Sequence, residues 1–388
     1  FGTEGNRPSV ALTGGTLTLN GANYNAIVPQ NFSTLSLGLG YSTINAIRNS
    51  GVPELIFAGV AQAKGSHVNF TSSSGTAMGA STNAAPHVRF TAPPVLLGGD
   101  GSIGSTTLSI LPGARYGSDF VTHDAVAGVR ALSTAEYKVP ANNDVNTAGA
   151  MENVKLTSTT PAGFPGLAGD KVINSLNINV NTSASWTPTN KLTLTSGQLI
   201  SGVQNQQMVF YYPSTLTAGS GTSDASLDVT ILNNNTYLRA AITDNGSGKV
   251  VLTKNGGGQL LLDGSVDNTY SGGTYLNEGT LTTGGTLNRR FLGLGPVRVD
   301  AGILNLVQAG ATANASGDDY TAVNGGQIQV ATVPYTSDDT FNIGPGCVIY
   351  GGWVYGQGLN SLDRGMGVPA TTPNITLGQD AIVAHNYT

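Results

Sequence analysis

Residues 269–281 read "TYSGGTYLNEGTL", in which β-forming residues alternate with residues typical of turns. The segment has one acidic residue and no group of side chains typical of catalysis. A glycine followed by alternating apolar residues recurs along the chain, as "GQLLL" from 258, "GTLTT" from 279, "GILNL" from 302, "GQIQV" from 326 and, more weakly, "GCVIY" from 346. The steps are 21, 23, 24 and 20 residues, so the segment is one unit of a repeat.

Each unit joins two short strands through a turn. The segments "TYLNEG", "VRVDAG", "TAVNGG" and "FNIGPG" lead into the last four glycine-led strands. In three of these turns Asn277, Asp300 and Asn324 stand two positions before a glycine. Asn and Asp can bond their own downstream backbone, and glycine adopts a left-handed turn without steric cost. The chain can therefore bend sharply once in every unit.

A unit of twenty-odd residues has too few apolar groups to form a core alone. Stacked on its neighbours, it gives each strand hydrogen-bond partners on both sides and buries alternate side chains in one interior. The sequence therefore predicts an all-β fold, a single-stranded parallel β-helix (β-solenoid) with irregular loop excursions, and favours the right-handed form. Roughly 22 residues per coil would give about 17 coils and a rod on the order of 80 Å long.

The repeat is uneven along the chain, and its most regular units lie in 228–350. We expect one elongated array over 1–388, which could divide into sub-arrays 1–160 and 161–388. Longer irregular stretches, interpreted as excursions from the rod, lie at 72–119, 120–150 and 203–226.

Composition narrows the function classes. Charged residues make up 10% of the chain, against about a quarter in ordinary globular proteins. The net charge is −5 and no basic run exists, so we expect no nucleic-acid partner. The longest apolar run, "LIFAGVAQA" (55–63), is too short to span a membrane, and it predicts a strand buried on both faces. No membrane insertion is expected in this segment.

The single cysteine and the first residues give further expectations. Cys347 alone excludes an intramolecular disulfide and a thiolate metal cluster. The chain opens at Phe1 without an initiator methionine or a signal peptide, which is typical of a processed or truncated piece.

Residues 252–281, "LTKNGGGQLLLDGSVDNTYSGGTYLNEGTL", resemble the autotransporter-associated β-strand repeat of bacterial passenger domains. The resemblance is strong over 228–306 and looser elsewhere. It implies a secreted or cell-surface β-helical stalk of a Gram-negative-type bacterium. The matching positions are Leu252, Thr253, Lys254, Gly256, Gly258, Leu260, Leu262, Gly264, Asn268, Tyr270, Gly272, Gly273, Thr274, Gly279, Thr280 and Leu281.

Acidic pairs are the main candidates for a metal site or for catalysis. Asp318-Asp319 and Asp338-Asp339 are twenty residues apart. On adjacent coils they could bind Ca²⁺ through oxygen ligands, or supply the carboxylates of a glycosidase. The composition of "SGDDY" and "TSDDT" favours solvated loop acids instead, and we assign no catalytic, cofactor or metal residue.

Other candidates are weaker. Ser118, Asp119, His123 and Asp124 offer the groups of a catalytic triad, but a triad is defined by geometry and not by adjacency in sequence. His67, His87 and His385 have no metal-ligand spacing, and the pair Arg289-Arg290 is expected in a loop. A glycan-binding platform could use the aromatic residues Trp186, Tyr211, Tyr212, Tyr350, Trp353 and Tyr355, although packing against the solenoid is the commoner role of such residues.

These observations favour a non-enzymatic extracellular structural protein, such as a cell-surface stalk, a fibre or a surface-layer subunit. Terminal coils of a solenoid expose strand edges, so self-association through them is expected. The alternatives are a glycan-binding adhesin and a carbohydrate-active β-helix enzyme. No cofactor is expected.

Overall fold

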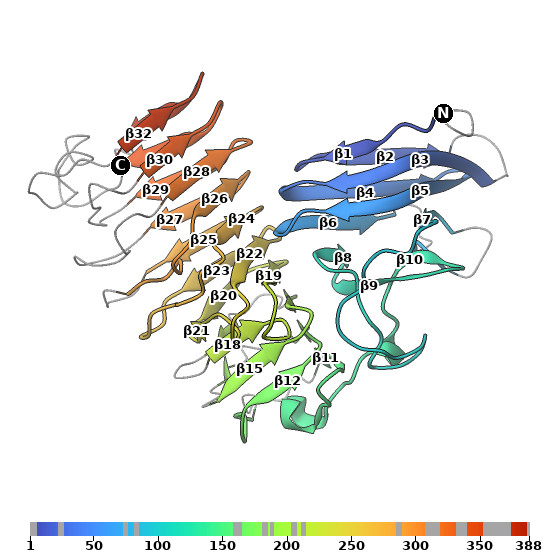
Figure 1. Ribbon diagram of the computed structural model, residues 1–388, viewed down its shortest axis with the longest axis horizontal. Coiled ribbons are helices and arrows are strands. Elements are labelled where there is room, and N and C mark those ends of the chain that lie inside the picture. The colour runs from blue at the N-terminus through green and yellow to red at the C-terminus, as the bar shows by residue number, and fades with distance from the viewer. Residues whose placement is uncertain are drawn as a thin grey trace, which may run out of the picture. The chain divides into compact units, whose positions relative to one another are not determined.

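The computed structural model is all-β, with 3% helix and with parallel sheets stacked as a β-solenoid of about 11 turns. It describes residues 6–21, 27–72, 77–80, 85–157, 165–180, 185–186, 190–202, 208–210, 215–284, 289–306, 319–330, 340–351 and 374–385. The predicted all-β parallel solenoid is confirmed, and the stacked arrows of Figure 1 show it directly. Its right-handedness stays a prediction.

The predicted number of about 17 coils is too high. Coils near the N-terminus are longer than 22 residues, because Leu17 pairs with Ile44 and Ile44 with Phe70 across neighbouring turns. Between Phe70 and its next partner, Tyr116, the chain makes a long excursion. Fewer turns are therefore built from the same length of chain.

The chain forms two compact units. Unit 1 comprises Phe1–Lys138 and Met151–Val154, and unit 2 comprises Val139–Ala150 and Lys155–Thr388. One sheet of unit 1 is wholly parallel and has the order β1 (Val10–Leu12), β3 (Ile27–Leu37), β5 (Val52–Gln62), β7 (His87–Phe90).

The second sheet of unit 1 changes direction at one edge. Its parallel strands are β2 (Thr16–Gly21), β4 (Gly40–Arg48), β6 (Ser66–Thr71) and β8 (Ala114–Tyr116). The antiparallel strands β9 (Asp119–Asp124) and β10 (Gly128–Ala131) then continue from β8. We call residues 119–131 the capping hairpin, because they close the edge of the parallel ladder.

The core of unit 1 is a column of aromatic and aliphatic side chains. Phe57 packs between Phe32 and Phe90, with ring centroids 5.2 and 5.9 Å apart. The apolar run 55–63 lies on β5, but it is buried on one face only: Leu55 and Phe57 are buried whereas Ala58 is exposed. The prediction of a strand buried on both faces is thus wrong, because a solenoid wall has only one interior side.

Unit 2 contains the two longest sheets and a shorter third one. The ten-stranded sheet has the order β11 (Asn153–Leu156), β13 (Ser175–Ile178), β16 (Gln198–Ser201), β19 (Ala225–Ile231), β22 (Val250–Asn255), β24 (Thr274–Leu276), β26 (Val297–Asp300), β28 (Asp319–Val323), β30 (Thr340–Ile343), β32 (Asn374–Leu377). The nine-stranded sheet has the order β14 (Ser185–Trp186), β17 (Met208–Phe210), β20 (Asn235–Leu238), β23 (Gln259–Leu262), β25 (Thr280–Thr283), β27 (Ile303–Leu306), β29 (Gln327–Val330), β31 (Val348–Gly351), β33 (Ile382–His385). The short sheet contains β12 (Lys171–Ile173), β15 (Lys191–Leu194), β18 (Thr215–Ala218) and β21 (Ala241–Ile242).

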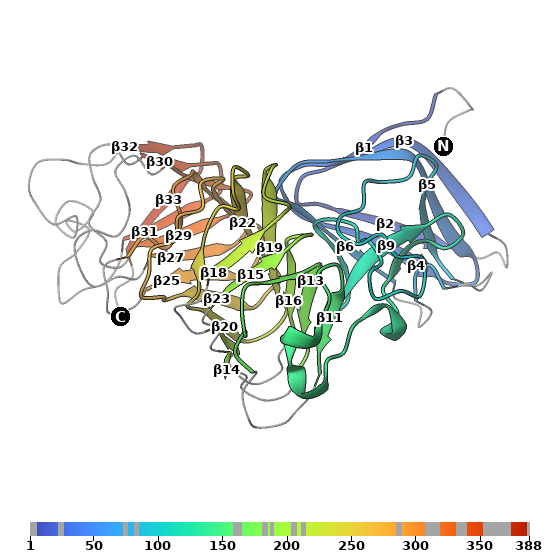
Figure 2. The same ribbon diagram turned by 60° about the horizontal axis from the view of Figure 1, so that its bottom comes forward.

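The repeat of the sequence appears as stacked strands. The five glycine-led segments become β23, β25, β27, β29 and β31, which lie side by side in Figure 2. Their second apolar residues stack in register and are fully buried: Leu260, Leu281, Leu304, Ile328 and Ile349. The segments that lead into the last four become β24, β26, β28 and β30 of the ten-stranded sheet.

The turns vary more than the sequence predicted. Gly279 adopts the expected left-handed conformation (φ +72°), but in the next coil Ala301 does so (φ +56°) and not Gly302. Gly302 is needed for space instead, because a Cβ there would lie 2.8 Å from Cγ of Leu276. The same sequence position therefore serves a turn in one coil and close packing in the next.

Candidate functional site

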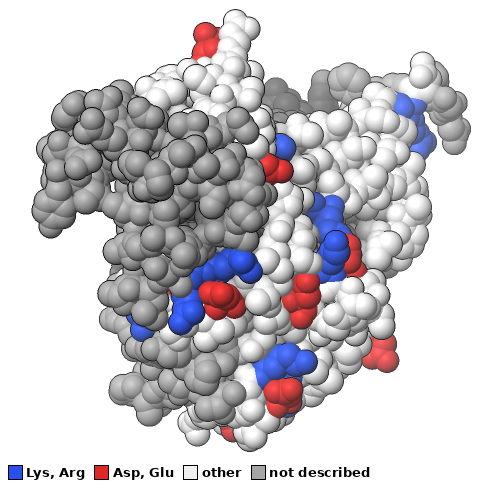
Figure 3. Space-filling view, turned by 60° about the vertical axis from the view of Figure 1, so that its left-hand side comes forward, with Lys and Arg blue, Asp and Glu red and all other residues white. Residues whose placement is uncertain are grey.

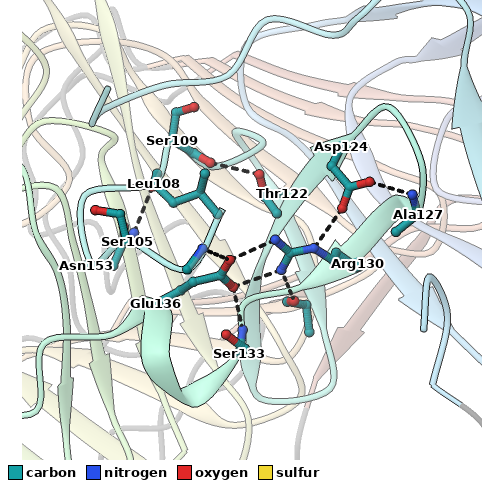
Figure 4. Close-up of polar contacts among 12 residues, drawn as sticks. Ser105, Leu108, Ser109, Thr122, Asp124, Ala127, Arg130, Ser133, Glu136 and Asn153 are labelled. Carbon is teal, nitrogen blue, oxygen red and sulfur yellow. Dashed lines mark hydrogen bonds and ion pairs between the residues drawn. The ribbon is translucent and has the colours of Figure 1, made fainter. Parts of the chain in front are cut away.

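The capping hairpin carries the densest ionic network among the described residues (Figure 4). Arg130 on β10 donates through Nε to Asp124 Oδ2 at 2.9 Å. Its two terminal nitrogens donate to the carboxylate of Glu136 at 2.7 and 2.8 Å. Glu136 ends the short helix η1 (Thr134–Glu136) and is 1% exposed. A bidentate arginine–carboxylate pair of this kind fixes orientation as well as charge.

Backbone amides complete the network. Glu136 accepts from the amides of Gly104 at 3.0 Å and Ser133 at 2.7 Å. Burial works against its charged form, but the hydrogen bonds from Arg130 and these amides outweigh it and lower the pKa of Glu136 to about 2. Both carboxylate oxygens are therefore committed to holding the polypeptide together.

Asp124 is held in the same way. Burial opposes its charged form, yet hydrogen bonds from the amides of Ala127 and Val126 and from Arg130 lower its pKa. The Glu136 carboxylate in turn raises the pKa of Arg130. At neutral pH this cluster keeps its charges and does not exchange protons.

Two histidines join the capping hairpin to β7. His123 Nε2 accepts from the amide of Phe90 at 3.3 Å, and its ring lies 5.5 Å from the Phe90 ring. His87 Nδ1 lies 3.0 Å from the carbonyl oxygen of Ala127 in the hairpin turn. Burial lowers the pKa of His123, with Asp124 opposing and Arg89 adding to the shift.

The grouping of Ser118, Asp119, His123 and Asp124 therefore lies on one hairpin, with its base and acid bound elsewhere. The imidazole accepts from a backbone amide, and Asp124 is bound to Arg130. His67 stacks on the ring of Tyr41, with centroids 5.4 Å apart. The side chain of His385 lies outside the described residues.

Most of the predicted calcium cluster also lies outside the described residues, namely Asp318, Asp338 and Asp339. Asp319 begins β28, is exposed, and accepts from the hydroxyl of Thr340, its partner in the next coil. In the part of the chain that the structure describes, no three His, Cys, Asp or Glu side chains are placed to hold a metal ion.

Of the predicted aromatic platform, Tyr350 is half-buried on β31. The side chain of Trp186 and residues Tyr211, Tyr212, Trp353 and Tyr355 are outside the described residues. In the predicted basic loop, the amide of Arg290 donates to Asp267 of the preceding coil at 3.1 Å. The structure thus gives Arg290 a coil-to-coil contact.

Unit 2 contains a buried polar ladder that the sequence did not predict. Asn277 donates to Asn255 Oδ1 at 2.8 Å, and Asn255 donates to Asp228. Two coils further on, Asn324 donates to Asp300 at 2.9 Å. The sequence identifies these turn positions as Asx residues, but their bonds run between coils and not only along the local backbone.

Lys254 is the other feature that the sequence did not predict. It occupies the interior column of the ten-stranded sheet, between Val229 and Leu276 in register, and it is fully buried. Its Nζ donates to the carbonyl oxygens of Asn255 at 3.0 Å, Gly256 at 2.6 Å and Glu278 at 3.0 Å. Burial lowers the pKa of Lys254 to about 7, with Glu278 opposing the shift.

Charged side chains are sparse on the surface in Figure 3, and blue and red atoms lie mostly next to one another. None of the helices in the described part of the chain has the length and apolar character needed to cross a lipid bilayer. Scans against protein-family models, curated proteins and solved structures give no match.

Proposed function

We propose that this chain is a non-enzymatic extracellular structural protein, a stalk, fibre or surface-layer subunit of a Gram-negative-type bacterial cell surface. The observation that carries the proposal is the continuous interior of unit 2. Apolar side chains stack in register from coil to coil, as Leu260 on Leu281 and Leu281 on Leu304. A parallel ladder with such an interior resists bending and can be lengthened by adding coils.

The polar chemistry of the described residues supports the same role. The Asn277–Asn255 bond and the carbonyl contacts of Lys254 connect one coil to the next. The ion pairs of Arg130 hold loops of unit 1 together. These groups act on the protein's own backbone, as expected where rigidity is the purpose.

Self-association through terminal coils is part of the proposal. In the last described coil, the inward residues Ile375 and Leu377 are 38% and 48% exposed. Their partners one coil earlier, Phe341 and Ile343, are 2% and 1% exposed. A coil from a second copy, stacked in parallel on β32, would bury these side chains and pair the strand edge.

Electron microscopy and sedimentation of the purified chain test this assembly. We expect end-to-end particles for the wild type and their loss in Leu377→Asp, which places a charge at the contact. The matched control is Thr376→Asp, because Thr376 is on the same strand but pairs with the exposed, outward Asn342. A wild-type chain that stays a single monomer at high concentration contradicts self-assembly.

The cellular location has a separate test. Antibodies against the described segments should bind intact cells of the source bacterium as well as permeabilised ones. Binding only after permeabilisation contradicts an extracellular role. The family resemblance of 252–281 is the support for this part of the proposal.

A further inference from the structure

The edge strand β7 is covered by the capping hairpin. In its sheet, β7 pairs with β5 on one side only. The amide of Thr91, just after β7, donates to Phe57 of β5 at 2.9 Å. Because alternate amides of a strand point to opposite sides, the amide of Phe90 faces away from β5, towards the hairpin.

Glycine makes the cover close. Gly128 begins β10 with φ +70°, and a Cβ there would overlap the carbonyl oxygen of Val88. Uncovered strand edges are sites of unwanted pairing, and natural proteins protect them. Here the protection consists of backbone contact at Gly128 and of two histidine side chains.

The histidines form a reciprocal clasp. His123 on β9 accepts the Phe90 amide of β7, and His87 on β7 reaches the Ala127 carbonyl oxygen of the hairpin. Each imidazole therefore binds the backbone of the other element. The two bonds differ chemically, because an imidazole nitrogen accepts only when it carries no proton, whereas a nitrogen that donates can do so in either charge state.

We propose that His123 is an acid-sensitive latch, whose protonation releases the capping hairpin from the edge of β7. With Nε2 accepting, the neutral ring carries its proton on Nδ1. A second proton on Nε2 would turn the acceptor into a donor that faces the Phe90 N–H. The contact then changes from attraction to repulsion, while the His87 contact to Ala127 persists.

The charged neighbours set the direction of the switch. On the hairpin, Asp124 favours the protonated ring, but Arg130 binds that carboxylate. On β7, Arg89 disfavours the protonated ring and is itself paired with Glu54 of β5 at 3.0 Å. The remaining titratable neighbour is His87, also on β7.

Burial adds to this balance and lowers the pKa of His123 below its ordinary 6.5. The folded state therefore prefers the neutral ring. The stabilisation is complete above about pH 6.5 and is lost as the pH falls below that value. The latch is closed at neutral pH and opens in acid.

Hydrogen exchange of the full-length chain at pH 7.5 and pH 5.0, corrected for intrinsic rates, tests the latch. Loss of one hydrogen bond should speed exchange at Phe90 about three- to tenfold relative to pH 7.5. His123→Gln retains an acceptor near the Nε2 position and cannot titrate, so its Phe90 amide should stay protected at both pH values. The matched control His87→Asn retains a donor and should keep the wild-type pH dependence.

Two results would overturn the proposal. The first is an unchanged, corrected Phe90 exchange rate in the wild type between pH 7.5 and 5.0. The second is acid-induced exchange that persists in His123→Gln. If that variant does not fold, the NMR titration of the His123 ring in the wild type decides instead, because its midpoint must coincide with the loss of Phe90 protection.

Discussion

Asn277 donates its side-chain amide to the side-chain oxygen of Asn255, 2.8 Å away in the preceding coil, and both side chains are buried. The bond joins two turns at the end of the ten-stranded sheet. It belongs to a ladder in which Asn255 in turn donates to Asp228. Amide side chains thus do between coils what backbone amides do between strands.

Replacing Asn277 with Leu should destabilise unit 2. The leucine is similar in size but leaves the Asn255 oxygen buried without its donor, which costs about 1–3 kcal/mol. Urea denaturation of the full chain measures the change in the free energy of unfolding. Asn342→Leu, at an exposed outward position of β30, is the control and should change it by about 0.5 kcal/mol or less. Equal effects of the two variants would contradict a role of the ladder.

Lys254 should give unit 2 a distinctive dependence on pH. Its pKa in the fold, about 7, lies below the ordinary value of 10.5. The unfolded chain therefore binds more protons between these values, and the free energy of unfolding should rise with pH in that window. Lys254→Met should lack this contribution. The comparison is made by denaturation at pH 7, 8 and 9, and identical slopes for wild type and variant count against it.

Glu136 should make unit 1 sensitive to strong acid. Its pKa is lowered from 4.5 to about 2, so its stabilisation is present above pH 4.5 and is lost as the pH falls towards 2. Glu136→Gln should be destabilised at pH 7 by about 3 kcal/mol, because Arg130 keeps its charge but loses a charged partner. The difference between wild type and variant should shrink on acidification. Hydrogen exchange of peptides spanning 104–136 reports on this unit, and a difference that is constant from pH 7 to pH 2 is the contrary outcome.

Gly128→Ala should damage the contact between the capping hairpin and β7. The position combines φ +70° with a backbone carbonyl oxygen of β7 in the space that a Cβ would need, so both strain and displacement are expected. Gly117→Ala is the matched control, because Gly117 also has positive φ (+60°) but nothing within 4 Å. The control should lose about 1–2 kcal/mol from backbone strain alone, and Gly128→Ala distinctly more. Thermal unfolding of the two variants ranks them, and the reverse order refutes the packing argument.

The sequence predicts the solenoid of unit 2 well, because its cause is local and repeated. Each glycine-led strand carries its own alternation, so the repeat alone places Leu281 and Leu304 in the same column, where they pair in register. Unit 1 is less predictable. Its coils are longer, and the antiparallel capping hairpin departs from the repeat at a point where composition gives no warning.

The polar contacts are the least predictable part. A hydrogen bond such as that of Arg115 to Tyr41, or of Asn277 to Asn255, joins residues whose meeting depends on coil length. One usable signal is present, since Ser133 followed three residues later by Glu136 is the pattern of a capping box, and the structure contains that box. Lys254 gives a weaker signal, a lysine at an inward position of a strand.

That lysine has a consequence for how the stack is assembled. Similar coils can mispair by one whole repeat and still place aliphatic groups on aliphatic groups, a hazard of every periodic structure. A shift of one coil would take the Lys254 ammonium away from the Glu278 carbonyl oxygen that it binds in the next turn. Lys254 therefore acts as an index mark in an otherwise uniform scale, one position from which every coil in unit 2 can be counted.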